Sequence, residues 1–351
     1  MLKYILKLFF FLFPLFLSAQ SEGTYSVYLI GDAGSDTVPG KALLMLKEQL
    51  ISHPNSAVVF LGDNVYPSGL DIHDKATVMR LESQLQILNN YKGHAYFIPG
   101  NHDWQQQKRN GLSVLAAEQK YVKEYIKNKT TVANKNELTF LPENGLPGPE
   151  TVLLNGKQRL IFLDTQWFLH FYKKNKIQTK KHTKELFYSR LDSLLNLAKQ
   201  NGERVLITAH HPMYTNGNHC GKKQPLRFLV NRTPFQLFGL LGLNRLLSQD
   251  LSQPRYAKLR KRLLESFNKY DNIIYAAGHD HNLQCFKECA NGFIVSGAGS
   301  KITHFHKKKK FNSLFQDDTK TGFIKIEYPT DGIRKVIVYR VGEPEKIVDG
   351  F

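Results

Sequence analysis

The segment Gly62-Asp63-Asn64-Val65-Tyr66 constrains the possible folds more than any other part of the chain. It follows an apolar run at residues 57–61, which is typical of a buried strand. Gly62 permits a sharp turn, so the carboxylate of Asp63 leaves the sheet where the strand ends. Carboxylate oxygens can bridge two hard cations, and the phenolate of Tyr66 can bind one of them. We therefore expect a metal site here if other segments supply the remaining ligands.

Four further segments have the same design, a strand-like run followed by side chains that bind metals. The predicted strands cover residues 25–30, 94–98, 204–208 and 272–277. The side chains that follow them are Asp32, Asn101 with His102, His210, and His279 with His281. In an open α/β sheet, ligands bind at the carboxyl ends of the strands, so we expect these groups to converge on Asp63.

The number of candidate ligands suits two metal ions. The candidates are Asp32, Asp63, Tyr66, Asn101, His210, His279 and His281. If Asp63 is shared, each ion has four protein ligands and keeps open positions for water and substrate. Each motif is common by itself, but five of them in order, all at strand ends, are not expected by chance.

Periodicity elsewhere predicts one α/β (α+β) domain over residues 21–351. Helices are expected at 41–51, 71–90, 111–127, 182–200 and 256–269. A hairpin is expected at 151–164, and further strands at 283–286, 292–296, 321–327 and 333–339. The helix at 41–51 separates two strands, which indicates parallel pairing. We expect two mixed sheets flanked by helices, a four-layer αββα sandwich, with an inserted loop or lid at 213–254 and a basic loop at 301–320.

Residues 1–20 have the pattern of a secretory signal peptide. Lys3 and Lys7 precede or flank a short apolar run, and Ser18-Ala19-Gln20 supplies small residues near its end. This pattern predicts a secreted or periplasmic protein. The alternative is a membrane anchor formed by an uncleaved N-terminal segment, although the run is short for a bilayer span of about 20 residues.

The formal net charge of +18 favours anionic partners such as phosphate esters, acidic polymers or anionic membrane surfaces. The lysine run from Lys307 to Lys310 is most typical of a solvated loop. The cysteines are Cys220, Cys285 and Cys289, and the last two could form a local disulfide. Their spacing is not that of a zinc site.

The five motifs, over roughly residues 25 to 300, resemble the calcineurin-like metallophosphoesterases. The position of Tyr66, three residues after Asp63, resembles the purple (tartrate-resistant type) acid phosphatases in particular. The resemblance implies the metallophosphoesterase fold and two metal ions. Fe³⁺ would be held by Asp32, Asp63, Tyr66 and His281, and a second ion, Fe²⁺, Zn²⁺ or Mn²⁺, by Asp63, Asn101, His210 and His279.

The resemblance also implies two catalytic residues, His102 beside Asn101 and His219 in the loop after His210. No role is assigned to His211. The implied activity is that of a secreted acid phosphatase, which hydrolyses phosphate monoesters by attack of a metal-bound hydroxide on a small phosphorylated substrate. We expect a monomer without specific nucleic-acid binding.

Three alternatives stay open at this point. The same two-metal core could serve a phosphodiesterase or nucleotide pyrophosphatase. A degenerate fold could serve a cell-surface binding protein, although every ligand position is filled. The net charge is also compatible with a protein that binds polyanions.

Overall fold

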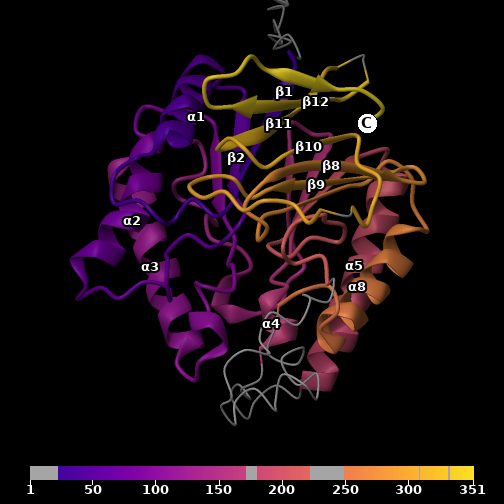
Figure 1. Ribbon diagram of the computed structural model, residues 1–351, viewed down its shortest axis with the longest axis horizontal. Coiled ribbons are helices and arrows are strands. Elements are labelled where there is room, and N and C mark those ends of the chain that lie inside the picture. The colour runs from indigo at the N-terminus through magenta and orange to yellow at the C-terminus, as the bar shows by residue number, and fades with distance from the viewer. Residues whose placement is uncertain (1–22, 171–179, 222–248, 308, 331–332) are drawn as a thin grey trace, which may run out of the picture.

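The structure, a computed structural model, describes residues 23–170, 180–221, 249–307, 309–330 and 333–351. In these residues, two mixed β-sheets pack face to face between layers of helices (Figure 1). The predicted four-layer arrangement is therefore confirmed. The predicted signal peptide and residues 222–248 of the predicted lid lie outside the described residues.

The first sheet combines strands from distant parts of the chain in the order β13-β12-β11-β1-β2-β3. Strands β1 (Tyr25–Ile30), β2 (Ser56–Phe60) and β3 (His94–Phe97) are parallel. Strands β11 (Gly322–Tyr328), β12 (Lys335–Arg340) and β13 (Lys346–Val348) continue the sheet with antiparallel pairing. Helix α1 (Lys41–Ser52) connects β1 to β2, so the predicted parallel β-α-β unit is confirmed.

The second sheet has the order β10-β8-β9-β7-β6-β5-β4. Its parallel strands are β5 (Gln158–Phe162), β6 (Arg204–Thr208), β7 (Ile274–Ala277) and β9 (Asn291–Ser296). Strands β8 (Leu283–Glu288) and β10 (Phe315–Asp317) are antiparallel to their neighbours. Strand β4 (Glu150–Leu154) forms the predicted hairpin with β5, and Asn155 and Gly156 at its turn have φ of 49° and 67°.

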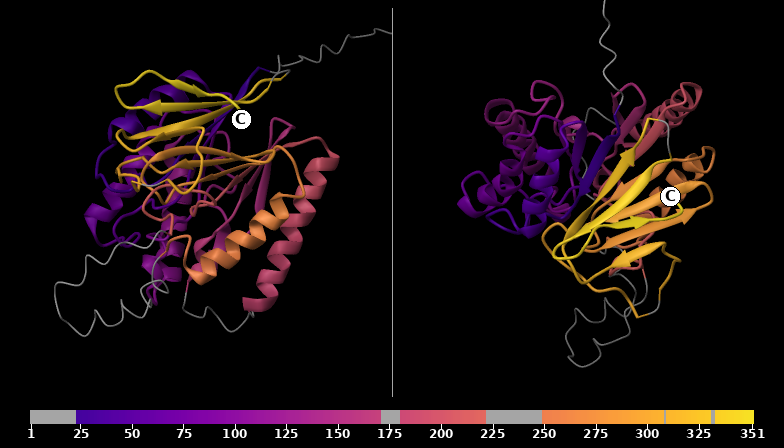
Figure 2. Two further views of the ribbon diagram at one scale, coloured as in Figure 1. Left: turned by 45° about the vertical axis from the view of Figure 1, so that its right-hand side comes forward. Right: turned by 90° about the horizontal axis from the view of Figure 1, so that it is seen from above.

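Alternation along the strands divides the core into an inner layer and two outer layers. In β1, Val27 and Leu29 belong to the cluster between the sheets, whereas Tyr28 and Ile30 belong to the cluster that includes the helices. Helices α1, α2 (Lys75–Leu85) and α3 (Gly111–Lys129) cover the first sheet, and α5 (Lys180–Gln200) and α8 (Pro254–Phe267) cover the second (Figure 2). Each fully buried Leu or Ile side chain contributes about 1.5–3 kcal/mol to folding.

A few elements differ from the prediction. Helix α2 begins at Lys75 rather than Asp71, because Oδ1 of Asp74 accepts a hydrogen bond from the Ala76 amide at 2.9 Å and caps the helix. Strands β10 and β13 and the short helix α4 (Gln166–Leu169) were not predicted. These elements have only three or four residues, too few to show periodicity.

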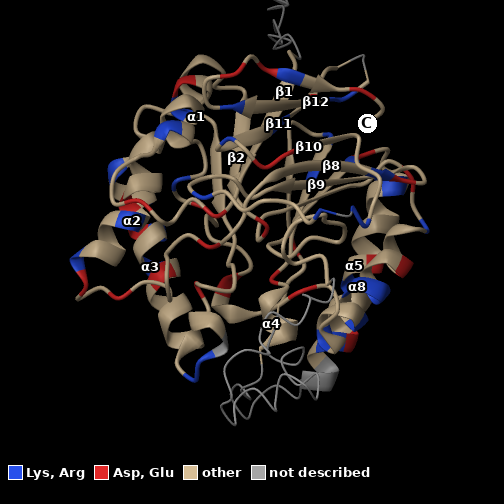
Figure 3. Cartoon of the chain, in the orientation of Figure 1, with Lys and Arg blue, Asp and Glu red and all other residues tan. Residues whose placement is uncertain are grey.

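Neither the cysteines nor the distribution of charge marks a functional site in the described residues. Cys220, Cys285 and Cys289 are free thiols, so the local disulfide considered above is not formed. In the part of the chain that the structure describes, no helix combines the length and apolar character needed to cross a bilayer. Basic residues are distributed over the helices on both sides of the molecule (Figure 3), so charge alone does not mark one binding surface.

Candidate metal centre

The predicted ligands leave the carboxyl ends of parallel strands from both sheets. Strands β1, β2 and β3 lead to Asp32, Asp63 and Asn101, and strands β6 and β7 lead to His210 and the His279–His281 turn. Because the strands within each parallel set run in one direction, their carboxyl ends form one edge, where these side chains meet.

The turns at this edge need unusual backbone conformations and close approach. Asp32, Asp63 and His279 have φ of 58°, 55° and 70°, in the left-handed region that residues other than glycine rarely adopt. Such strain is characteristic of functional sites, where the surrounding structure holds it. At position 100 only glycine fits, because a Cβ atom there would lie 2.3 Å from Oδ1 of Asp63.

One half of the site is centred on the hydroxyl group of Tyr66. This hydroxyl lies 2.9 Å from Oδ1 of Asp32, 3.1 Å from Oδ2 of Asp63 and 3.0 Å from Nε2 of His281. The backbone amide of His279 donates to the other oxygen of Asp32 at 2.7 Å, which orients that carboxylate. The side chains of Asp32, Asp63 and His281 therefore meet at the hydroxyl of Tyr66, as predicted for ligands of the first metal ion.

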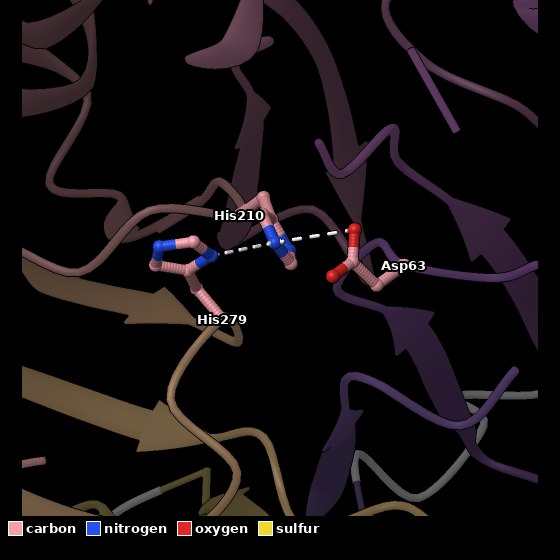
Figure 4. Close-up of side chains that lie close together, drawn as sticks. All are labelled: Asp63, His210 and His279. Carbon is pink, nitrogen blue, oxygen red and sulfur yellow. Dashed lines mark hydrogen bonds and ion pairs between the residues drawn. The ribbon is translucent and has the colours of Figure 1, made fainter. Parts of the chain in front are cut away.

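The other half of the site joins Asn101, His210 and His279. Oδ1 of Asn101 lies 3.0 Å from Nε2 of His210 and 3.0 Å from Nδ1 of His279, and these two nitrogens are 3.2 Å apart. Nε2 of His210 is also 3.4 Å from Oδ1 of Asp63. Asp63, His210 and His279 point toward one another from three loops (Figure 4) and offer ligand atoms within 4.8 Å.

Asp63 joins the two halves because its two oxygens face different partners. Oδ2 contacts the hydroxyl of Tyr66, and Oδ1 faces His210. The side chain of Asp63 is only 2% exposed. Burial alone would raise the pKa of this carboxyl, but His210 and His102 outweigh burial and lower it, so Asp63 is ionised. A buried carboxylate shared in this way is suited to bridge two cations.

The hydrogen-bonding of the imidazole rings shows that this donor set fits a cation. Nδ1 of His210 lies 2.8 Å from the carbonyl oxygen of Leu61, and Nε2 of His279 lies 2.9 Å from that of Gln249. These nitrogens must carry protons, so in the neutral rings the other nitrogens direct lone pairs at Oδ1 of Asn101. Three lone pairs then converge, and this arrangement suits a cation placed between them.

Without a metal ion, a proton on His210 supplies that positive charge, and Tyr66 is held as the neutral phenol. Burial alone would lower the pKa of His210, but the carboxylate of Asp63 outweighs burial and raises the pKa to about 9. Burial and then the carboxylates of Asp32 and Asp63 raise the pKa of Tyr66 well above its usual value. Metal ligands must be deprotonated, so a metal ion would replace these protons.

The two predicted catalytic histidines lie beside the ligands and are partly exposed. The amide of His102 donates to Oδ1 of Asp63 at 2.9 Å, and Nε2 of His102 is 3.8 Å from Oδ2 of the same carboxylate. The ring of His219 lies 3.9 Å from the ring of His279, measured between centroids. Both side chains can therefore reach a molecule bound at the site.

His211 differs from His210 beside it because its ring nitrogen Nδ1 contacts a hydroxyl group outside the predicted ligand set. Its Nδ1 is 2.8 Å from the hydroxyl of Thr165, which also accepts the backbone amide of His211 at 3.2 Å. The ring packs at 4.5 Å against the ring of His279, and burial holds the pKa of His211 well below its usual value. His211 is thus a buried neutral ring that supports His279.

Asp103 supports the site but was not identified from the sequence. Its carboxylate accepts hydrogen bonds of 2.7–3.1 Å from backbone amides of both ligand turns, those of Asp63, Asn64, Val65 and Gly100. These hydrogen bonds fix the two turns relative to each other. The only signal in the sequence was the position of Asp103 directly after the Asn101-His102 pair.

Lys301 also lies at the site, although its sequence context predicts only a basic loop at residues 301–320. Its Nζ lies 3.3 Å from the centre of the Tyr66 ring. Burial lowers the pKa of Lys301, and the carboxylates of Asp63 and Asp32 oppose this effect. The signal that could have found it is the Gly-Ala-Gly-Ser turn that follows a predicted strand at 292–296.

A family model described as calcineurin-like phosphoesterase matches residues 25–239 of this chain. Among curated proteins, no sequence matches it significantly. Three of the similar solved structures share the fold at low sequence identity. GAP50, described as the anchor in the inner membrane complex of Plasmodium, is 16% identical, with a TM-score of 0.56 over 93% of this chain and 89% of its own.

A dimetal phosphatase from Danio rerio is 13% identical, with a TM-score of 0.51 over 93% of this chain and 99% of its own. The purple acid phosphatase PPD1 from yellow lupin (Lupinus luteus) seeds is 15% identical, with a TM-score of 0.52 over 91% of this chain. The match covers 52% of the lupin chain. At these identities the likeness concerns the fold.

Proposed function

The chain belongs to the calcineurin-like phosphoesterase family, and from this premise we propose that it is a phosphatase of the purple acid phosphatase type. It would hydrolyse phosphate monoesters at a site for two metal ions. The observation that carries this proposal is the pair of ligand clusters around Tyr66 and Asn101, joined through the two oxygens of Asp63.

The donor atoms support a different ion in each half. Tyr66, Asp32, Asp63 and His281 include three oxygen donors that become anionic, and these favour a trivalent iron ion. Asn101, His210, His279 and Asp63 offer two imidazoles and only one anionic group, which suits Fe²⁺, Zn²⁺ or Mn²⁺. When bound, such a pair of ions would supply positive charge for the phosphoryl oxygens and would acidify water.

The chain's own residues would bind and protonate the substrate. His102 is 17% exposed in its side chain and is held by its amide bond to Asp63, so its ring borders the site without being enclosed. His219 reaches the site from the loop after strand β6 of the second sheet, and its ring packs against that of His279 at an interplanar angle of 33°. We assign to these histidines the binding of phosphoryl oxygens and the donation of a proton to the leaving alkoxide oxygen.

The decisive experiment measures hydrolysis and metal content together. The purified protein is loaded with iron and with zinc or manganese, and its kcat/KM is measured for p-nitrophenyl phosphate and for bis(p-nitrophenyl) phosphate. We expect two metal ions per chain and a higher kcat/KM for the monoester than for the diester. In Asp63→Asn, the monoester kcat/KM should fall by more than about 100-fold, which exceeds the effect typical of residues that only support ligands. Asp192→Asn, on helix α5 and paired with Lys269 at 3.2 Å, is the matched control.

Other outcomes would identify a different function. Preference for the diester would indicate the phosphodiesterase or nucleotide pyrophosphatase alternative. Two bound metal ions without hydrolysis of either ester would overturn the enzymatic proposal in favour of a binding role for the fold. Tight binding to acidic polymers, unaffected by Asp63→Asn, would favour the polyanion-binding alternative.

We further propose export of the chain as a monomer, on the basis of residues 1–20. Expression in a bacterial host, followed by fractionation and N-terminal sequencing, tests this proposal. Recovery of a soluble periplasmic monomer whose N-terminus lies near Gln20 supports export with cleavage. Recovery of the intact chain in the membrane fraction supports the N-terminal anchor.

A further inference from the structure

Hydrogen bonds on both sides of Lys301 hold the segment after strand β9 against the half of the metal site that contains Tyr66. The hydroxyl of Ser300 donates to the carbonyl oxygen of Asp32 at 2.5 Å, and the amide of Thr303 donates to that of His281 at 2.9 Å. At position 297, a Cβ atom would lie 2.8 Å from Oδ2 of Asp32, so the chain passes directly against this carboxylate. The backbone of Lys301 is thus held at the rim of the site.

The side chain of Lys301 extends toward the ligands rather than into solvent. Its Nζ lies 3.3 Å from the centre of the Tyr66 ring, whose hydroxyl contacts Asp32, Asp63 and His281. Lys301 is partly buried, and no carboxylate of the described residues forms an ion pair with it. A partly desolvated ammonium group with three donors, and with no carboxylate of the described residues paired to it, is suited to receive an anion.

The other cation near Tyr66 is already engaged with the protein. Arg80 donates from Nε to the carbonyl oxygen of Ser35 at 3.0 Å and from Nη1 to that of Tyr66 at 2.8 Å. Its guanidinium group therefore supports the turn that carries Tyr66. Of these two cations, Lys301 lies over the Tyr66 ring and has no hydrogen-bond acceptor among the residues that the structure describes.

We propose that Lys301 binds the non-bridging phosphoryl oxygens of the substrate and makes the site selective for phosphate monoesters over diesters. This inference rests on the proposed phosphatase function. A monoester carries close to two negative charges at pH 7, because its second pKa is about 6, whereas a diester carries one. A compact ammonium charge stabilises the doubly charged ester more, since the interaction energy scales with the product of the charges.

The test compares Lys301→Gln and Lys301→Arg with Lys307→Gln, which removes the same charge from an exposed position on the same loop. The kcat/KM of each metal-loaded protein is measured at pH 7 for p-nitrophenyl phosphate and bis(p-nitrophenyl) phosphate, which share a leaving group. Binding of inorganic phosphate is measured by calorimetry. Metal content and melting temperature are recorded for every variant, so that lost metal or lost folding is recognised.

In Lys301→Gln we expect phosphate affinity and the monoester kcat/KM to fall about tenfold, the effect of one lost hydrogen bond to a charged group, mainly through KM. The diester kcat/KM should change much less. Lys301→Arg should recover most of the loss, and Lys307→Gln should behave like the wild type. Equal losses for both esters, or unchanged phosphate affinity, would overturn the inference. If the wild type hydrolyses neither ester, the proposed function fails, and phosphate calorimetry still decides the role of Lys301.

Discussion

Nε2 of His210 lies 3.0 Å from the amide oxygen of Asn101, and in the neutral ring neither atom has a proton to offer the other. The proton of His210 is committed at Nδ1 to the carbonyl oxygen of Leu61. Two acceptors at this distance in a buried site repel each other unless a positive charge lies between them.

Metal ions should stabilise the protein, and Asn101→Ala should reduce that effect. A ligand at 1,000 times its Kd stabilises the folded state by about 4 kcal/mol, which corresponds to a rise of several degrees in melting temperature. Melting is followed after chelation and after addition of Mn²⁺ or Zn²⁺. Asn196→Ala, on the exposed face of helix α5, is the control. An equal metal-induced shift in Asn101→Ala would contradict the assignment of this ligand.

Tyr66→Phe should separate the two metal sites. It removes the hydroxyl that contacts Asp32, Asp63 and His281, while Asn101, His210 and His279 stay in place. In the iron-loaded protein, a tyrosinate-to-iron absorption band is expected to disappear, with retention of the second ion. Visible spectra and metal analysis check this outcome. Tyr121→Phe, which removes a hydroxyl bonded to Glu82 at 2.6 Å, should leave the band unchanged.

Asp103→Asn should weaken metal binding although Asp103 is not a ligand. The backbone N–H groups of Asp63 and Gly100 now donate to the Asp103 carboxylate, and the side-chain amide of Asn would place a second N–H donor against them. We therefore expect the free energy of unfolding to fall by about 2 kcal/mol. Misplacement of Asp63 should lower metal affinity by about 10–100-fold. Chemical denaturation and metal titration measure these effects, and unchanged metal affinity would show that the turns hold without Asp103.

The ion pair of Arg159 and Glu203 should make stability depend on pH at the far ends of β5 and β6. The hydrogen bond from Arg159 lowers the pKa of Glu203, and the side chain of Glu203 is 4% exposed. A carboxyl whose pKa is lowered by folding stabilises the protein above its unfolded pKa of about 4.3. That contribution is lost as the pH falls through the lower pKa of the folded state.

Glu203→Gln should therefore reduce the free energy of unfolding by about 2 kcal/mol at pH 7, and the difference from the wild type should shrink as the pH falls below about 4. Urea denaturation at several pH values measures both quantities. Glu48→Gln, at an exposed position on helix α1, should show no such dependence. A difference that stays constant down to low pH would refute the ionic origin of the effect.

The ligand positions were predictable because the strands that carry them are buried and regular. In β2 and β6, apolar runs mark the strand, and the first polar residues after it mark the edge. Sequence order then suffices to bring Asp63 and His210 to one edge, where they lie 3.4 Å apart.

The supporting residues were not predictable, because their roles depend on contacts between loops. The carboxylate of Asp103 accepts hydrogen bonds from amides up to 40 residues away in the chain. Lys301 follows a strand of the second sheet and contacts Tyr66, which follows a strand of the first sheet. Short edge strands such as β10 and β13 form only when the neighbouring strand offers free backbone groups. Neither kind of contact leaves a periodic pattern in the sequence.

The pairing of β1 also has a consequence for biosynthesis. This strand lies inside the first sheet, with β2 on one side and β11 on the other, and Tyr25 is opposite Tyr328. A ribosome must therefore produce some 300 further residues before the earliest strand acquires its second neighbour. Until then the backbone N–H and C=O groups on one side of β1 are unpaired and can bind strands of other chains. A nascent chain of this protein therefore needs protection from aggregation for most of its synthesis.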